Sequence, residues 1–199
     1  MDKIKVVYVD DELDSNISRY LKKSYRHKDF EKEYEEVCFN SAEGYDSLIS
    51  NQLIKEANII LIDSKLFEND RVTTGKFSGE EFKMILKKVF PFIEVIVITQ
   101  NELEEDYGTI SKYREGFQDN PQQYYAEKLK KVLDAAIQNI NIYRNIADKL
   151  IANDGIDKVL IEKIVDSLEG SAKYDELTTT DIDDIILAFK ELQGDIDGE

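Results

Sequence analysis

The segment ANIILIDSKLF, residues 57–67, contains four consecutive apolar residues, Ile59 to Ile62, that end at a carboxylate, Asp63. A short run that is apolar at every position and rich in β-branched residues predicts a strand buried on both faces, as in a parallel sheet. An acidic residue at the carboxyl end of such a strand lies where open α/β sheets bind their ligands. The alternative is a solvated residue at the point where the chain leaves the sheet.

Two further apolar runs have the same form and also end in polar residues. KVVYVDDE ends with the three acids Asp10, Asp11 and Glu12, and EVIVITQN carries Thr99 near its end. Since the carboxyl ends of parallel strands lie at one edge of a sheet, we expect these polar groups to share that edge.

Strands and helices are predicted to alternate along the first two thirds of the chain. Strands are expected near 4–9, 35–39, 58–63, 94–99 and, more weakly, 108–113, and helices near 14–26, 42–54 and 79–90. Such alternation is typical of βαβ units. We therefore predict an α/β fold with a doubly wound, parallel, five-stranded sheet covered by helices on both faces.

The composition favours a cytoplasmic protein, although the charge alone names no partner. The 199 residues include 42 acidic and 26 basic ones, a net charge of −16, which disfavours nonspecific binding to nucleic acid or to an acidic membrane surface. No signal-peptide pattern is present, and no apolar run approaches the ~20 residues that span a bilayer. The single cysteine, Cys38, cannot form an internal disulfide, and its apolar neighbours predict a buried thiol.

From Asn120 onward the pattern is helical. Asn120 is suited to cap a helix and Pro121 to its first turn, and no helix breaker follows for some thirty residues. At about 1.5 Å per residue this helix would extend ~45 Å, beyond the sheet on which it begins. We expect a sheet domain over residues 1–135 and a helical module over 136–199, continuous with the long helix from about 121.

The distal half of the long helix needs a second surface to cover it. Two shorter amphipathic helices are expected at 155–170 and 178–194. The distal side chains Tyr143, Ile146 and Leu150 must be buried by these helices, by a second chain, or by both. The expected outcome is a homodimer, and the alternative is that the helices only complete the core of one chain.

The strand-end carboxylates form a candidate metal site. If the first and third strands lie side by side, Asp10, Asp11 and Asp63 converge, and three acids in one pocket repel each other unless a cation joins them. A hard ion with oxygen ligands, Mg²⁺, meets that need. Such a site is suited to accept a phosphoryl group on Asp63, with the Thr99 hydroxyl and the Lys112 ammonium completing the shell.

The order VDDE, LID, a strand-end threonine and a late lysine resembles the receiver domain of two-component response regulators, over roughly residues 3–135. Gly79 is similar to the glycine that follows the loop after the acceptor aspartate in that family. The resemblance implies a flavodoxin-like fold and a phosphoacceptor that is not itself an enzyme. It also implies site residues with these roles: Asp10 and Asp11 for Mg²⁺, Asp63 for phosphorylation, Thr99 as the sensing hydroxyl and Lys112 as the partner of the phosphoryl group.

Three positions depart from the family pattern. Tyr113 follows the lysine where the family has proline, Gln100 follows the threonine where it has a small residue, and Thr109 stands where it has an aromatic residue. These departures indicate that the surface that changes on phosphorylation has been rebuilt.

Two other functions fit part of the pattern. A haloacid-dehalogenase-type phosphatase would use Asp10 as nucleophile and Glu12 as acid, with Thr99 and Lys112 in support, but would leave Asp63 without a role. A degenerate receiver would remain unphosphorylated and act as a scaffold.

The expected partners follow from the resemblance and from the charge of the tail. A sensor histidine kinase or a small phosphodonor would supply the phosphoryl group. From Asp154 onward the chain has fourteen acidic residues, four lysines and no arginine, so a phosphate backbone would be repelled. We therefore expect output through protein–protein contacts of the helical module, without nucleic acid or membrane.

Overall fold

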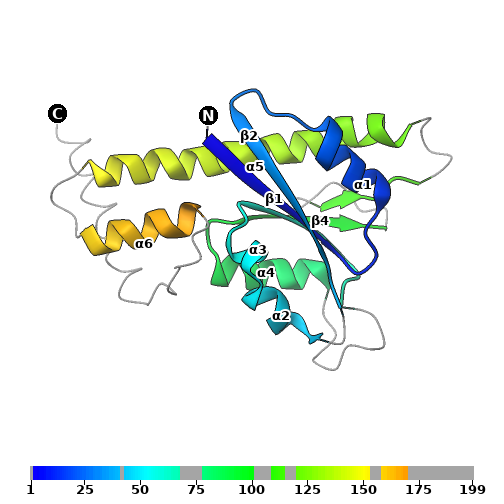
Figure 1. The fold of residues 1–199 in the computed structure, drawn as a ribbon, viewed down its shortest axis with the longest axis horizontal. Helices are drawn as coiled ribbons and strands as arrows, with labels where there is room; N and C mark the ends of the chain where they lie inside the picture. The colour runs from blue at the N-terminus through cyan, green and yellow to red at the C-terminus, as the bar shows by residue number, and fades with distance from the viewer. Residues whose placement is uncertain are drawn as a thin grey trace.

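The computed structural model describes residues 2–40, 43–67, 78–100, 109–114, 120–152 and 158–169. Its centre is a fully parallel five-stranded sheet with the order β2-β1-β3-β4-β5, the flavodoxin-like doubly wound order (Figure 1). The strands are β1 (Asp2–Asp10), β2 (Phe30–Cys38), β3 (Ile59–Asp63), β4 (Glu94–Thr99) and β5 (Thr109–Ser111). The predicted fold class is confirmed.

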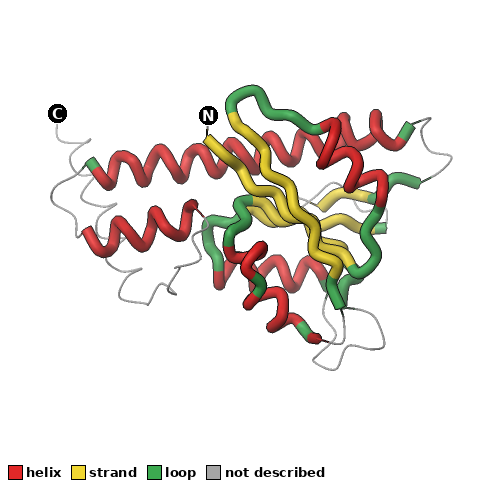
Figure 2. The backbone as a smooth tube through the Cα atoms, in the orientation of Figure 1, coloured by secondary structure: helices red, strands yellow, loops and turns green. Residues whose placement is uncertain are grey.

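Helices cover both faces of the sheet (Figure 2). One face packs against α1 (Ser15–Arg19), its π-helical continuation η1 (Tyr20–Ser24) and α5 (Pro121–Ile151). The other face packs against α2 (Tyr45–Ser50), α3 (Gln52–Lys55) and α4 (Gly79–Val89). Side chains that alternate along a strand therefore enter two different cores, as Tyr8 and Val9 do on β1.

The edge strand β2 differs most from the sequence prediction. It begins at Phe30, ahead of the expected 35–39, and Cys38 is exposed, so the predicted buried thiol was wrong. Among the described strands, β2 pairs with β1 alone, and most of its side chains are partly or fully exposed, which accounts for its many glutamates. An edge strand lacks the continuous apolar run that marks the inner strands.

The helix expected near 42–54 is two short helices. The chain breaks at Asn51, whose side chain accepts a hydrogen bond from the Leu53 backbone N–H and so caps α3. Asparagine is a preferred N-cap residue, so a new helix, α3, begins directly after it.

Helix α5 begins as predicted and stays unbroken over 31 residues. The Asn120 side chain accepts a hydrogen bond from the Gln122 N–H, and Pro121 occupies the first turn. The buried side chains that it packs on the sheet extend past residue 135 as far as Ile140. One continuous helix therefore contributes side chains both to the sheet core and to the helical module.

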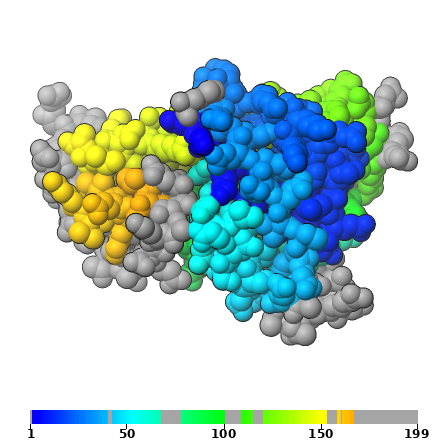
Figure 3. Space-filling view, viewed as in Figure 1, coloured from blue at the N-terminus to red at the C-terminus, as the bar shows by residue number. Residues whose placement is uncertain are grey.

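The distal part of α5 is covered by α6 (Lys158–Glu169), and together they form a lobe beside the sheet (Figure 3). Ala147 and Leu150 of α5 are buried against Ile161 and Ile164 of α6. The helix expected at 155–170 is confirmed as α6, whereas the one expected at 178–194 and most of the loop 64–78 lie outside the described residues. Among the helices described, none has the length and apolar character to cross a membrane.

The lobe lies at the amino edge of the sheet. The Phe92 ring, just before β4, packs edge-on against Tyr143 of α5 with ring centroids 5.5 Å apart. Nearby, Arg144 Nη2 donates a hydrogen bond of 3.1 Å to the backbone oxygen of Lys3, at the start of β1. Helix α5 therefore connects the carboxyl edge of the sheet, where it begins, to the lobe at the opposite edge.

Candidate functional site

The carboxyl ends of β1 and β3 place Asp10 and Asp63 next to each other. The two strands are neighbours, and Val9 pairs with Ile62 in their register, so the residues that follow are level. Both aspartates are buried, with 1% of Asp10 and 5% of Asp63 exposed. The site lies between β1 and β3, where the strand order reverses and where doubly wound sheets of this order bind ligands.

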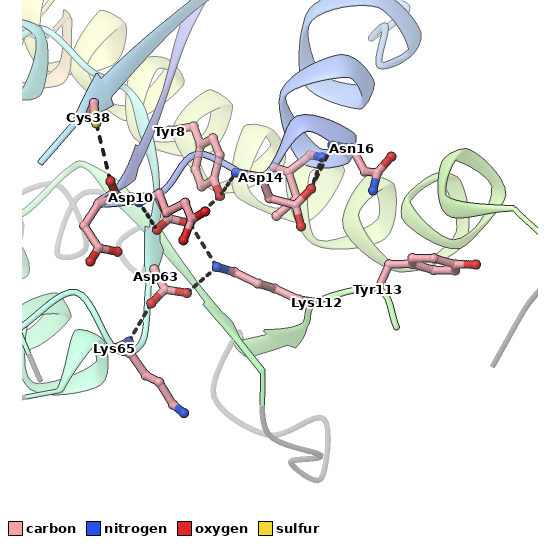
Figure 4. Close-up of polar contacts among 12 residues, drawn as sticks. Tyr8, Asp10, Asp14, Asn16, Cys38, Asp63, Lys65, Lys112 and Tyr113 are labelled. Carbon is pink, nitrogen blue, oxygen red and sulfur yellow. Dashed lines mark hydrogen bonds and ion pairs between the residues drawn. The ribbon is translucent and has the colours of Figure 1, made fainter. Parts of the chain in front are cut away.

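The Lys112 ammonium lies between these two carboxylates (Figure 4). Its Nζ atom is 2.9 Å from Asp10 Oδ2 and 2.7 Å from Asp63 Oδ1. Burial by itself lowers the lysine pKa, but the contacts with Asp63 and Asp10 outweigh it and raise the pKa above the usual value. Lys112 is therefore a fixed positive charge in the site.

Thr99 positions the segment that carries this lysine. Its backbone oxygen accepts a hydrogen bond of 2.6 Å from the Lys112 N–H, immediately after β5. Thr99 is buried at the end of β4, with 1% exposed. The strand end therefore fixes where the Lys112 side chain starts.

The two carboxylate oxygens of Asp63 have different partners. Oδ2 accepts a hydrogen bond of 2.8 Å from the Lys65 N–H. Oδ1 is buried, and its contact with Lys112 is ionic, without hydrogen-bond geometry. A buried carboxylate oxygen without a hydrogen bond is uncommon, and here the Lys112 ammonium compensates its charge.

Gly79, the first residue of α4, lies against the backbone of Asp63. Its N–H donates a hydrogen bond of 2.8 Å to the Ser64 oxygen. A Cβ atom at this position would be 2.6 Å from the Asp63 oxygen and 2.8 Å from Ser64 Cα. Only glycine lets the helix start this close to the acceptor strand.

Asp10 accepts three hydrogen bonds. Lys112 Nζ and the Tyr8 hydroxyl both donate to Oδ2, the latter at 2.5 Å, and the Glu12 N–H donates to Oδ1 at 3.2 Å. Burial and then the Asp10 charge raise the pKa of Tyr8 far above its usual value, so the hydroxyl is a donor. These contacts fix the orientation of the Asp10 carboxylate.

Asp11 and Glu12, in contrast, are exposed. Partial desolvation raises the pKa of Asp11, and the charges of Asp10 and Asp63 raise it further. When Asp10, Asp11 and Asp63 are all ionised, the single Lys112 ammonium leaves the site with two uncompensated negative charges. The electrostatics of the site therefore favour an additional cation.

The donor set suits Mg²⁺, which prefers carboxylate oxygens. The poorly satisfied Asp63 Oδ1 and the raised pKa of Asp11 are consistent with a cation near Asp10, Asp11 and Asp63. Within the described ranges, however, no three acidic, histidine or cysteine side chains are already gathered as a metal site. The Asp11 carboxyl group already interacts with Asp10, and a bound ion would bring both of them together with Asp63.

Sequence reasoning placed Asp10, Asp63 and Lys112 at one edge of the sheet, and the structure brings their side chains into contact. It did not identify Tyr8, which appeared as one apolar residue of a strand. The available signal was its spacing, because a residue two positions before Asp10 on a strand lies on the same face.

Comparisons with known proteins do not identify a family. No family model and no curated protein matches the chain. Among solved structures, the chain is similar to a two-component transcriptional regulator described as AraC from Clostridium phytofermentans ISDg, with 16% identity and a TM-score of 0.38. That match covers 71% of this chain and 98% of the other.

Proposed function

We propose that the chain is a response-regulator receiver that accepts a phosphoryl group on Asp63 and is not itself an enzyme. The observation that supports this function best is the buried Lys112 ammonium, 2.7 Å from Asp63 Oδ1 and 2.9 Å from Asp10 Oδ2. A lysine in this position can pair with the oxygens of a phosphoryl group held on Asp63.

The proposed reaction is a substitution at phosphorus. Asp63 Oδ1 attacks the phosphorus of a phosphohistidine or an acyl phosphate, and the bond from phosphorus to the donor breaks, with its electron pair leaving on the donor. Lys112 pairs with the phosphoryl oxygens as they arrive. When bound by Asp10, Asp11 and Asp63, Mg²⁺ would neutralise charge on the same oxygens.

The proposed output is a protein–protein contact of the lobe formed by distal α5 and α6. The phosphoryl donor would be a sensor histidine kinase or a small phosphodonor in the cytoplasm. The route from site to lobe is α5, because the residue after Lys112 is bonded to this helix: the Tyr113 N–H donates to the Tyr125 hydroxyl at 3.0 Å. Proline, which has no N–H, could not make this bond.

The first test is phosphorylation by acetyl phosphate in the presence of Mg²⁺, followed by intact-mass spectrometry. We expect one added phosphoryl group in the native protein and none in Asp63→Asn. Asp134→Asn, which removes a carboxylate bonded to Tyr25 on the same face of the sheet, is the control and should still be modified.

Two other outcomes would support the remaining functions. Modification that persists in Asp63→Asn and is lost in Asp10→Asn would favour the phosphatase, which uses Asp10 as nucleophile. No modification, together with unchanged partner binding in Asp63→Asn, would favour the unphosphorylated scaffold.

A further inference from the structure

Tyr8 is a buried polar residue of the site that the receiver pattern does not account for. Its side chain is completely buried, and its hydroxyl donates to Asp10 Oδ2 at 2.5 Å (Figure 4). The same hydroxyl accepts a hydrogen bond of 3.3 Å from the Asp14 N–H. Tyr8 thus connects Asp10 with the residue that caps helix α1.

Because of the Tyr8 hydroxyl, the two carboxylate oxygens of Asp10 accept hydrogen bonds from different donors. Oδ2 accepts from both Tyr8 and Lys112, which uses its two lone pairs. Oδ1 accepts a longer bond of 3.2 Å from the Glu12 N–H, and the Asp11 carboxyl group lies beside Asp10. Oδ1 is therefore the oxygen left with capacity to bind a cation.

We propose that Tyr8 is a positioning residue for the cation site, an inference that rests on the Mg²⁺ site of the proposed function. By holding Oδ2 against Lys112, Tyr8 keeps Oδ1 directed away from the core and available to the ion that Asp11 and Asp63 also bind. Hydrogen bonds from a second layer of residues orient metal ligands in this way, and their loss typically costs 10- to 100-fold in affinity.

A purely structural role predicts something different, and Tyr25 provides the comparison. Tyr25 is also buried, with 1% exposed, it packs in the same core, and its hydroxyl also donates to a carboxylate, Asp134 Oδ1, at 2.9 Å. If the Tyr8 hydroxyl only satisfied the core, removing either hydroxyl would lower stability and leave cation binding unchanged.

The test measures Mg²⁺ binding to the full chain by titration calorimetry for the native protein, Tyr8→Phe and Tyr25→Phe. Each substitution removes one oxygen atom and keeps the ring, so both variants should fold. We expect the dissociation constant for Mg²⁺ to rise about tenfold or more in Tyr8→Phe and to stay unchanged in Tyr25→Phe. Melting temperatures without Mg²⁺ report the structural cost of each change separately.

The outcomes separate this inference from the proposed function. Equal Mg²⁺ affinity in the native protein and Tyr8→Phe, or tighter binding in Tyr8→Phe, would overturn the positioning role and leave the proposed function standing. Equal losses in Tyr8→Phe and Tyr25→Phe would also overturn it, because the effect would then follow stability. Absence of binding to the native protein would remove the Mg²⁺ site itself, while phosphorylation of Asp63 would still be decided by mass spectrometry.

Discussion

Gly79 is the residue at which the acceptor strand and a helix come closest. A side chain here would meet the Asp63 carbonyl oxygen at 2.6 Å, and the neighbour is backbone, which cannot turn aside. The position therefore constrains both the fold and the placement of the Asp63 carboxylate.

We predict that Gly79→Ala destabilises the protein by about 1–3 kcal/mol, the usual cost of forcing extra atoms into a packed site. At an unconstrained helical position the same exchange would stabilise by roughly 0.5–1 kcal/mol, so the sign of the effect is informative. Urea unfolding of the native and variant proteins measures it. A stabilised variant would show that the contact with Asp63 relaxes easily.

The site residues differ in how far the sequence reveals them. Asp63 and Asp10 could be placed because each ends a buried apolar run, and Lys112 because it lies at the end of the last strand candidate, 108–113. Tyr8 could not be recognised, since a tyrosine inside an apolar run is compatible with ordinary core packing. Its role depends on a contact with the Asp14 N–H and on the Asp10 rotamer, and both arise only in the folded chain.

At the scale of elements, the strands whose residues are most buried were predicted most accurately from the sequence. Strands β3 and β4 were placed well because all or nearly all of their residues are buried. The edge strand β2 carries many charged residues, and only its carboxyl half was predicted. The π-helical segment η1, which packs in the same core as α5, was predicted only as part of a helix near 14–26.

The contact between β5 and α5 is made by tyrosines. The Tyr125 hydroxyl accepts from the Tyr113 N–H, and the Tyr124 hydroxyl donates to the Ser111 oxygen at 2.9 Å. The Tyr113 and Tyr124 rings also pack edge-on, 5.8 Å apart. The segment on either side of Lys112 is thereby attached to the first turns of α5.

We predict that Tyr125→Phe destabilises the protein by roughly 1–3 kcal/mol, because the Tyr113 N–H loses its acceptor in a partly buried place. The larger effect should be on signalling, since the link between Lys112 and α5 is weakened. Hydrogen exchange of α5, with and without acetyl phosphate, measures both. Tyr124→Phe, which removes a neighbouring hydroxyl bonded to Ser111, is the control for general loosening of the contact.

An identical response of α5 to phosphorylation in the native protein and in Tyr125→Phe would contradict this route. The structural change caused by phosphorylation would then have to reach the lobe through an element other than α5.

At the scale of the whole molecule, the lobe has a buried interface between α5 and α6 and also exposes apolar side chains on the outside of these helices. Leu150 and Ile164 are buried between α5 and α6, whereas Ile142, Ile151 and Val159 are 49%, 52% and 61% exposed. Among the described residues, contact within one chain therefore covers only part of the apolar surface of these helices.

We predict a homodimer through this exposed surface, because symmetric pairing of identical helices is a common way to cover it. Ile151→Lys should shift the protein to the monomer in analytical ultracentrifugation over a dilution series. Met84→Lys is the matched control: Met84 is 74% exposed on α4 and is not among the residues of the α5–α6 cluster, so its replacement should leave association unchanged. A native protein that sediments as a monomer at every concentration would exclude the dimer.

The length of α5 has a mechanical consequence. Its 31 residues form a rod of about 45 Å that is attached near one end to the Lys112 segment and near the other to the start of the sheet by Phe92 and Arg144. Because the rod is attached near both ends and packed on the sheet between them, a displacement at the Tyr125 end would be transmitted along the helix axis. The contacts of Phe92 and Arg144 are where such a displacement would reach the lobe.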